Sequence, residues 1–123
     1  MKKILFIIGG IFNTIFGVFH IWLAWRIHLS DTFSPKAGSL ALNVFASIVV
    51  FYFAYISFFQ QRDLQTTKLG RTTLALVALV YLSRALEEFI LFEFSFIIFI
   101  SCVLVGGLYT VLLLLPGNNP SNL

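Results

Sequence analysis

Charged and polar residues that could do chemistry stand inside otherwise apolar sequence. Arg84, Glu87 and Glu88 fall within "YLSRALEEFILFEFS", residues 81–95, with long apolar runs on both sides. His20 and Asn43 interrupt two earlier apolar runs. Ionisable residues inside membrane segments are costly and usually mark a functional site. Together these residues could bind a small polar or anionic ligand, with Arg84 supplying the positive charge.

Helical spacing lets Arg84 pair with either neighbouring glutamate. Glu87 follows it by three residues and Glu88 by four, so both lie on its side of a helix. We predict a neutralised pair whose remaining hydrogen bonds are completed by His20 and Asn43. In the alternative arrangement, Arg84 extends outward to lipid headgroups and both glutamates lie in the interfacial water.

Tyr81 and Asn13 lie on the polar faces of the same predicted helices. Tyr81 is one helical turn before Arg84, and Asn13 shares a stripe with Gly10, Gly17 and His20. For Asn13 the pattern favours a hydrogen bond between helices. The predicted ligand-binding set is therefore Asn13, His20, Asn43, Tyr81, Arg84, Glu87 and Glu88.

Motifs of enzymes and metal proteins are absent from the sequence. Phosphate-binding glycine loops, G-x-S-x-G and H-E-x-x-H do not occur. Both histidines, His20 and His28, are in the first apolar segment, so a bis-histidine haem would need a homodimer that pairs two His20 side chains. Cys102 is the only cysteine, which excludes an internal disulfide and a Cys-based metal site. We predict no catalytic residue, no metal ligand and no particular cofactor.

Composition places the chain in the membrane. It is 59% hydrophobic and 11% charged, whereas soluble domains carry about 25% charged residues. The net charge of +3 is weak and scattered, so nucleic acid is not an expected partner. The expected partners are the lipid bilayer, a small polar or anionic ligand, and a second copy of the chain or another membrane protein.

Four segments are long and apolar enough to span a bilayer as helices, which needs about 20 residues each. We predict a single all-α domain, residues 1–123, folded as an up-down-up-down integral membrane four-helix bundle. Ser34 and Pro35 form a helix start signal, and the first segment, which no cleavage site follows, is read as a retained helix rather than a signal peptide. The predicted helices span about 4–27, 35–60, 69–91 and 94–115, followed by a disordered tail, 116–123.

Positive charges predict the orientation. Five basic residues flank the N-terminus and the second loop, against Arg26 and Lys36 at the first loop. By the positive-inside rule both termini are cytoplasmic in a multi-pass protein of the cell membrane. At a rise of 1.5 Å per residue, His20, Asn43, Arg84 and Glu88 then share one layer near the extracytoplasmic end. We predict that they converge there inside the bundle, with Arg84 mostly buried.

The first helix, "GGIFNTIFGVFHIWLAW", and the four-helix layout resemble the small DoxX-like membrane proteins. The resemblance covers the layout of nearly the whole chain. It implies a four-helix integral membrane protein, of a kind associated in part with redox or quinone chemistry. No diagnostic motif aligns, so the resemblance transfers no functional residue.

Three functions remain open at this point. The first is binding or transport of a small polar or anionic ligand at the predicted site. The second is a non-enzymatic accessory or interaction subunit, for which Cys102, Gly106 and Thr110 would form a ladder of small residues. The third is a quinone-linked redox protein, in which His20 would exchange protons with help from Tyr81. The sequence favours a non-enzymatic role and leaves an enzymatic one open.

Overall fold

A computed structural model describes residues 2–29, 36–90 and 95–116, and within these ranges all secondary structure is helical. The predicted helices are present, with ends that differ from the prediction by one or two residues. The predicted start signal at Ser34 and Pro35 and the tail after Pro116 lie outside the described residues. The helices are α1 (Lys2–Leu29), α2 (Lys36–Phe59), α3 (Gln61–Thr66), α4 (Lys68–Ile90) and α5 (Phe96–Leu114).

The short helix α3 was not predicted, because its six residues fall in the expected loop between the second and third segments. Thr67 separates α3 from α4 with an extended backbone. Its hydroxyl accepts a hydrogen bond from the backbone N–H of Gly70 at 2.9 Å, which caps the start of α4. Gly70 packs so closely on α3 that a Cβ there would lie 2.0 Å from the backbone oxygen of Asp63. The absence of a side chain at Gly70 therefore allows α3 to pack this closely against the start of α4.

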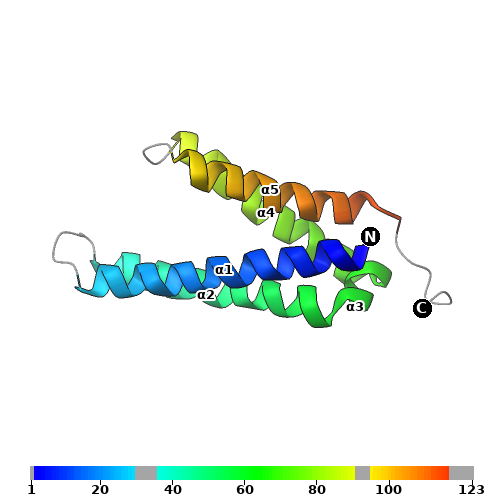
Figure 1. The fold of residues 1–123 in the computed structure, drawn as a ribbon, viewed down its shortest axis with the longest axis horizontal. Helices are drawn as coiled ribbons and strands as arrows, with labels where there is room; N and C mark the ends of the chain where they lie inside the picture. The colour runs from blue at the N-terminus through cyan, green and yellow to red at the C-terminus, as the bar shows by residue number, and fades with distance from the viewer. Residues whose placement is uncertain (1, 30–35, 91–94, 117–123) are drawn as a thin grey trace.

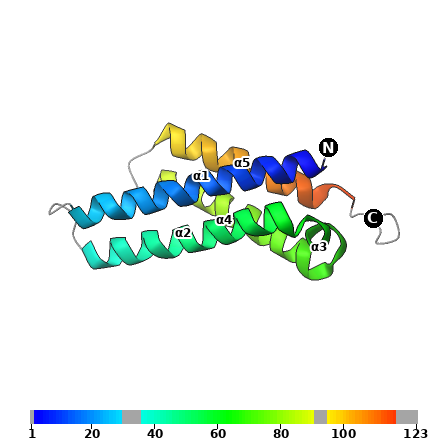
Figure 2. The same cartoon turned by 60° about the horizontal axis from the view of Figure 1, so that its bottom comes forward.

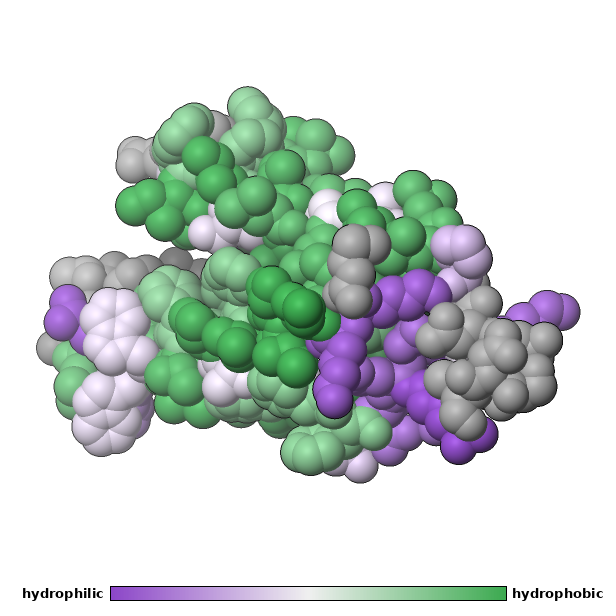
Figure 3. Space-filling view, turned by 45° about the vertical axis from the view of Figure 1, so that its right-hand side comes forward, coloured by the Kyte–Doolittle hydropathy of each residue, from purple (hydrophilic) through white to green (hydrophobic). Residues whose placement is uncertain are grey.

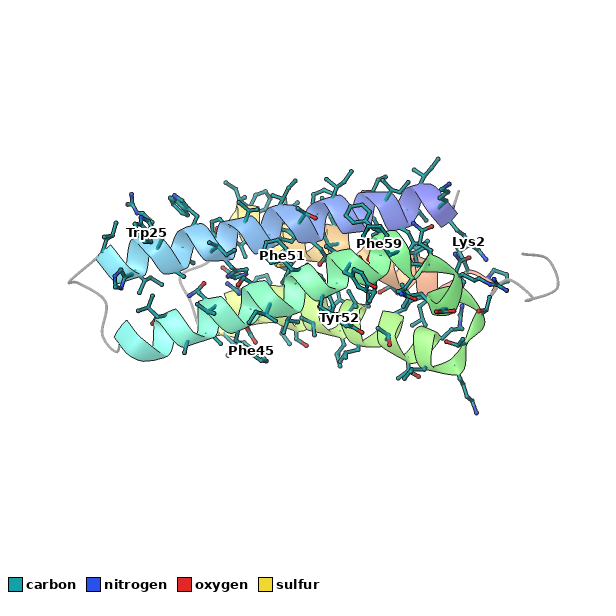
Figure 4. All side chains as sticks on the ribbon, turned by 90° about the horizontal axis from the view of Figure 1, so that it is seen from below. Lys2, Trp25, Phe45, Phe51, Tyr52 and Phe59 are labelled. Atoms are coloured by element: carbon teal, nitrogen blue, oxygen red, sulfur yellow. The ribbon has the colours of Figure 1, made fainter. Side chains whose placement is uncertain are left out.

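Helices α1 and α2 form the first antiparallel hairpin (Figure 1). Glycines on α1 let aromatic rings of α2 approach its backbone. A Cβ on Gly10 would lie 2.7 Å from the ring of Phe58, and one on Gly17 would lie 2.6 Å from the ring of Phe51. Figure 4 shows Phe51 between the two helices. Small residues thus allow the close helix approach that membrane helices use in place of a hydrophobic driving force.

Helices α4 and α5 form the second antiparallel hairpin. Gly106 of α5 admits Leu82 of α4, whose side chain would lie 2.8 Å from an added Cβ. Cys102 is buried nearby, and the Thr110 hydroxyl donates to the carbonyl of Gly106 at 2.8 Å. Gly106 and Cys102 of the predicted small-residue ladder are therefore used within the chain.

The two hairpins meet at one end of the molecule and diverge toward the other. In Figure 1 the start of α5 and the end of α4 stand apart from α1 and α2, and Figure 2 shows the same helices after rotation. Figure 3 shows this part as a separate lobe of apolar side chains, while hydrophilic side chains gather at the opposite end. The arrangement differs from an evenly packed bundle, because the second hairpin inclines away from the first.

Cations from two helices hold the last helix at the end where the hairpins meet. Arg71 of α4 donates to the carbonyls of Leu113 and of Leu115, the latter at 3.3 Å. The ammonium of Lys2 in α1 donates to the carbonyl of Pro116. The final carbonyls of a helix have no partner within it and carry partial negative charge, so cations stabilise this end.

Among the described residues, three helices are long and apolar enough to cross a membrane: α1, residues 38–59 of α2, and α5. Many of their large apolar side chains are exposed, as lipid contact would require; Trp25 is 62% exposed and Phe45 65%. Helix α4, which carries Lys68, Arg71, Arg84, Glu87 and Glu88, is not among these three. Three of the four predicted segments thus form helices with the length and apolar character that a membrane span requires.

Candidate functional site: two polar pairs beside a buried cluster

A buried cluster of polar side chains joins all four long helices where the hairpins cross. It consists of Asn13 of α1, Ser57 of α2, Tyr81 of α4 and Tyr109 of α5, hereafter the crossing cluster. Asn13, Ser57 and Tyr109 have no exposed surface, and Tyr81 is 5% exposed. A polar group deep in an apolar interior costs free energy unless it is hydrogen-bonded, so the bonds in this cluster decide its role.

Asn13 is the centre of the crossing cluster. Its side-chain carbonyl accepts a hydrogen bond from the Tyr81 hydroxyl. Its amide nitrogen donates to the Tyr109 oxygen at 2.7 Å and to the carbonyl of Gly9 at 2.8 Å. Tyr109 and Ser57 share a further hydrogen bond of 2.5 Å between their hydroxyls. The amide of Asn13 is therefore fully used, and the predicted hydrogen bond between helices is present.

A glycine one helical turn before Asn13 leaves space for the crossing cluster. A Cβ at Gly9 would lie 2.7 Å from the hydroxyl of Tyr109, so glycine one turn before Asn13 admits the tyrosine. The rings of Phe16 and Phe53 lie 5.8 and 6.4 Å from that of Tyr81, measured between centroids. Sequence reasoning missed Ser57 and Tyr109 as members of the crossing cluster, in which Tyr109 bonds Asn13 and Ser57 bonds Tyr109. The only available signal was that small and polar residues recur at helical spacing around both positions.

His20 and Asn43 form the first polar pair outside the crossing cluster. The distance from His20 Nδ1 to Asn43 Oδ1 is 3.0 Å, and the Asn43 amide nitrogen donates to the carbonyl of Ser39 at 2.9 Å. That second bond fixes the amide orientation, so the oxygen faces His20 and Nδ1 must donate the proton. In neutral His20 the Nε2 atom then keeps its lone pair and can accept a proton.

Arg84 and Glu88 form the second polar pair. Arg84 NH1 lies 2.7 Å from Glu88 Oε1, whereas Arg84 Nε lies 4.0 Å from Glu87 Oε2. The Glu88 side chain is 2% exposed, and its second oxygen accepts a hydrogen bond of 3.0 Å from the backbone N–H of Ser95. Ser95 directly precedes α5. Glu88 therefore ties the end of α4 to the start of α5 and supplies negative charge where a helix N-terminus favours it.

This role of Glu88 predicts a local effect of mutation. Glu88→Ala removes the partner of the part-buried Ser95 N–H and of one guanidinium nitrogen, and we expect it to lower the free energy of unfolding by about 2 kcal/mol. Glu87→Ala is the matched control, because Glu87 is 45% exposed and 4.0 Å from Arg84; it should cost below about 0.5 kcal/mol. Denaturant titration of the purified protein in detergent measures both. Equal effects of the two substitutions would contradict the assignment.

The structure distributes the seven predicted residues over three places. Asn13 and Tyr81 lie in the crossing cluster, His20 and Asn43 on the first hairpin, and the three residues of the "RALEE" stretch on the second. His20 bonds Asn43 on the first hairpin and Arg84 bonds Glu88 on the second, and the convergence of the two pairs stays a prediction. Arg84 is less buried than expected, with 36% of its side chain exposed. Within the described ranges, no group of three His, Cys, Asp or Glu residues is placed to hold a metal ion.

No family model, curated protein or solved structure matches this chain. The resemblance to DoxX-like proteins therefore stays a prediction. The described part of the chain defines the class only as a helical protein in which three helices are long and apolar enough for a membrane. Any more specific function must come from the geometry of the polar residues.

Proposed function

We propose that this chain is a multi-pass protein of the cell membrane. It binds or transports a small polar or anionic ligand, and the binding site lies between its two helical hairpins. In this proposal α4 is a fourth spanning helix beside α5, the four long helices form one bundle, and both termini are cytoplasmic. The basic residues at the start of α1, in α3 and at the start of α4 support this orientation: Lys2, Lys3, Arg62, Lys68 and Arg71.

The charges of α4 are compatible with a spanning helix because they are neutralised or lie near its ends. An unpaired charge at mid-helix costs about 2.5–3.5 kcal/mol on the insertion scale. Arg71 donates to the carbonyls that end α5, and Arg84 pairs with Glu88. The apolar stretch between these arginines is only 12 residues, about 18 Å of helix, so both arginines would extend toward the interfaces.

The observation that carries the binding proposal is the matched height of the two polar pairs. The rings of Phe16 and Tyr81 are in contact at the crossing. His20 follows Phe16 by four residues and Arg84 follows Tyr81 by three, so each lies about one turn farther along its own hairpin. The pairs thus flank the point at which the hairpins begin to separate. A small anion held there would meet a guanidinium from one side and an imidazole from the other.

The chemistry of the pairs favours an anion. A guanidinium offers five N–H donors in a fork that suits a carboxylate or phosphate. The contact between Arg84 Nε and Glu87 is long, at 4.0 Å, so a ligand oxygen could replace the Glu87 carboxylate there. His20 gains a donor at Nε2 when it is protonated. Glu88 stays in place, since it also holds the N–H of Ser95.

Two alternatives receive less support from the described geometry. An accessory subunit would present its small-residue ladder to a partner, but Gly106 of that ladder packs on Leu82 of the same chain. A quinone-linked enzyme would use Tyr81 together with His20, but the Tyr81 hydroxyl donates to Asn13 and His20 donates to Asn43. We therefore favour ligand binding over both.

A melting experiment with simple anions tests the proposal. We expect phosphate, sulfate or acetate to raise the melting temperature of the detergent-solubilised protein, since a ligand at 100 times its Kd stabilises by about 2.7 kcal/mol. Arg84→Gln should abolish the shift, measured against its own ligand-free melting temperature, and His20→Leu should reduce it while leaving the Arg84–Glu88 pair intact. Arg62→Gln is the control, because it removes the same charge from exposed α3. A shift that persists in Arg84→Gln would disprove the site.

A further inference from the structure

A second site lies at the opposite end of the molecule, between α2, α3 and the start of α4. A pocket of about 230 Å³ opens there, with Tyr52, Tyr55, Gln60, Asp63, Thr67 and Leu69 among its lining residues. Figure 4 shows Tyr52 on the side of α2 away from α1, toward α4. The pocket is smaller than the roughly 300–1,000 Å³ of drug-sized ligand sites, so it suits a small chemical group rather than a whole metabolite.

The charge of the residues that line the pocket is negative. Asp63 is its only charged residue. Among the described residues Asp63 forms no ion pair, although this end of the chain is rich in cations. Arg71, one of those cations, donates instead to the carbonyls at the end of α5. A carboxylate beside two tyrosine rings is a favourable environment for an organic cation, because ring faces also attract ammonium groups.

The surroundings of the pocket place it at a membrane surface. Helix α2 is a candidate span that ends at Phe59, and tyrosines are enriched where such helices leave the hydrocarbon core. Leu69, which lines the pocket, is 78% exposed, and Phe59 is 73% exposed. A ligand with a cationic head and an apolar body would satisfy Asp63 and cover these side chains together.

We propose that this pocket binds the primary ammonium of an ethanolamine phospholipid headgroup, with Asp63 as counter-ion and the rings of Tyr52 and Tyr55 beside it. The acyl chains then lie along Leu69 and the end of α2. The inference requires the chain to lie in a bilayer, but it is independent of the anion site at Arg84. Either site can be absent without affecting the other.

Native mass spectrometry of the full chain in detergent tests the proposal. Equal amounts of phosphatidylethanolamine and phosphatidylglycerol with identical acyl chains are offered together. We expect the ethanolamine lipid to be retained about fivefold more, and Asp63→Asn to bring the ratio close to one. Asp31→Asn removes the same charge from a distant part of the sequence and should keep the preference. Tyr55→Leu provides a second, uncharged disruption of the pocket and should also lower the ratio.

Other results of the same experiment also support or overturn the proposed lipid site. Displacement of the lipid by millimolar free ethanolamine would show that the alkylammonium alone is recognised, and no displacement would show that the lipid body contributes; both keep the site. An unchanged lipid ratio in Asp63→Asn would overturn the proposal. So would a wild-type protein that retains both lipids equally. Melting curves of each variant in the same detergent separate loss of binding from loss of fold.

Discussion

Gly70→Ala is expected to destabilise the protein by about 3 kcal/mol. The new Cβ would lie 2.0 Å from the backbone oxygen of Asp63 and 2.5 Å from the Cα of Leu64. Backbone atoms cannot move aside as a flexible side chain can, so α3 must shift away from α4 and expose Leu64, now only 3% exposed. Overpacking alone typically costs about 1–3 kcal/mol, and the loss of the contact under Leu64 adds to it.

The chain contains a matched control for this substitution. A Cβ at Gly107 meets nothing within 4 Å, and Gly107 lies inside α5. Gly107→Ala should therefore stabilise, by up to about 1 kcal/mol, through helix propensity alone. Denaturant titrations of the two variants in the same detergent give the comparison. A Gly70→Ala protein as stable as Gly107→Ala would show that α3 does not pack on α4 as described.

Asn13→Leu is the second large effect we expect, with a loss of about 3 kcal/mol. The substitution leaves the hydroxyl of Tyr81 buried without its partner, and a buried unsatisfied group costs about 1–3 kcal/mol. Tyr109 loses its bond to Asn13 but keeps the one to Ser57, so its loss is smaller. A single interhelical hydrogen bond in a membrane averages only about 0.6 kcal/mol. The expected loss is larger because one side chain serves two other helices.

A double-mutant cycle separates this network effect from a simple packing change. Tyr81→Phe should cost clearly less in the Asn13→Leu background than in the wild type, since its hydroxyl no longer has a partner to lose. Thr14→Val serves as control, because the Thr14 hydroxyl only donates to Gly10 of its own helix, at 2.9 Å. Additive effects of the Asn13 and Tyr81 substitutions would mean that the crossing cluster is not a unit.

Sequence patterns were sufficient for the helices but not for their arrangement. Apolar length predicted the long helices, because crossing a bilayer sets a minimum span. The stripe of small and polar residues around Asn13 predicted its hydrogen bond between helices, but no such prediction singled out Ser57 or Tyr109. The six residues of α3 are too few to produce a periodic signal. Its position depends on the contact between Gly70 and Asp63, which no spacing rule anticipates.

The pairing of the charges was predictable where it is local. Arg84 and Glu88 are four residues apart on one helix, so their contact follows from helix geometry alone. Whether Arg84 reaches His20 depends on the angle between two hairpins, and depth along a helix gives no information on that angle. The sequence also could not reveal that Glu88 holds the N–H of Ser95, because that bond depends on how the chain turns between α4 and α5.

The crossing cluster has a consequence for the order in which the chain can mature. Asn13 and Ser57 belong to the first hairpin and are synthesised long before Tyr109, which follows Asn13 by 96 residues. While the ribosome is still producing α4 and α5, the nascent first hairpin carries an amide and a hydroxyl with no partners from the second. In the proposed membrane protein, those groups would remain near the translocation machinery, water or headgroups until the last helix is made. The first hairpin alone would therefore not be ready to move fully into lipid, because its buried polar groups need partners from the second.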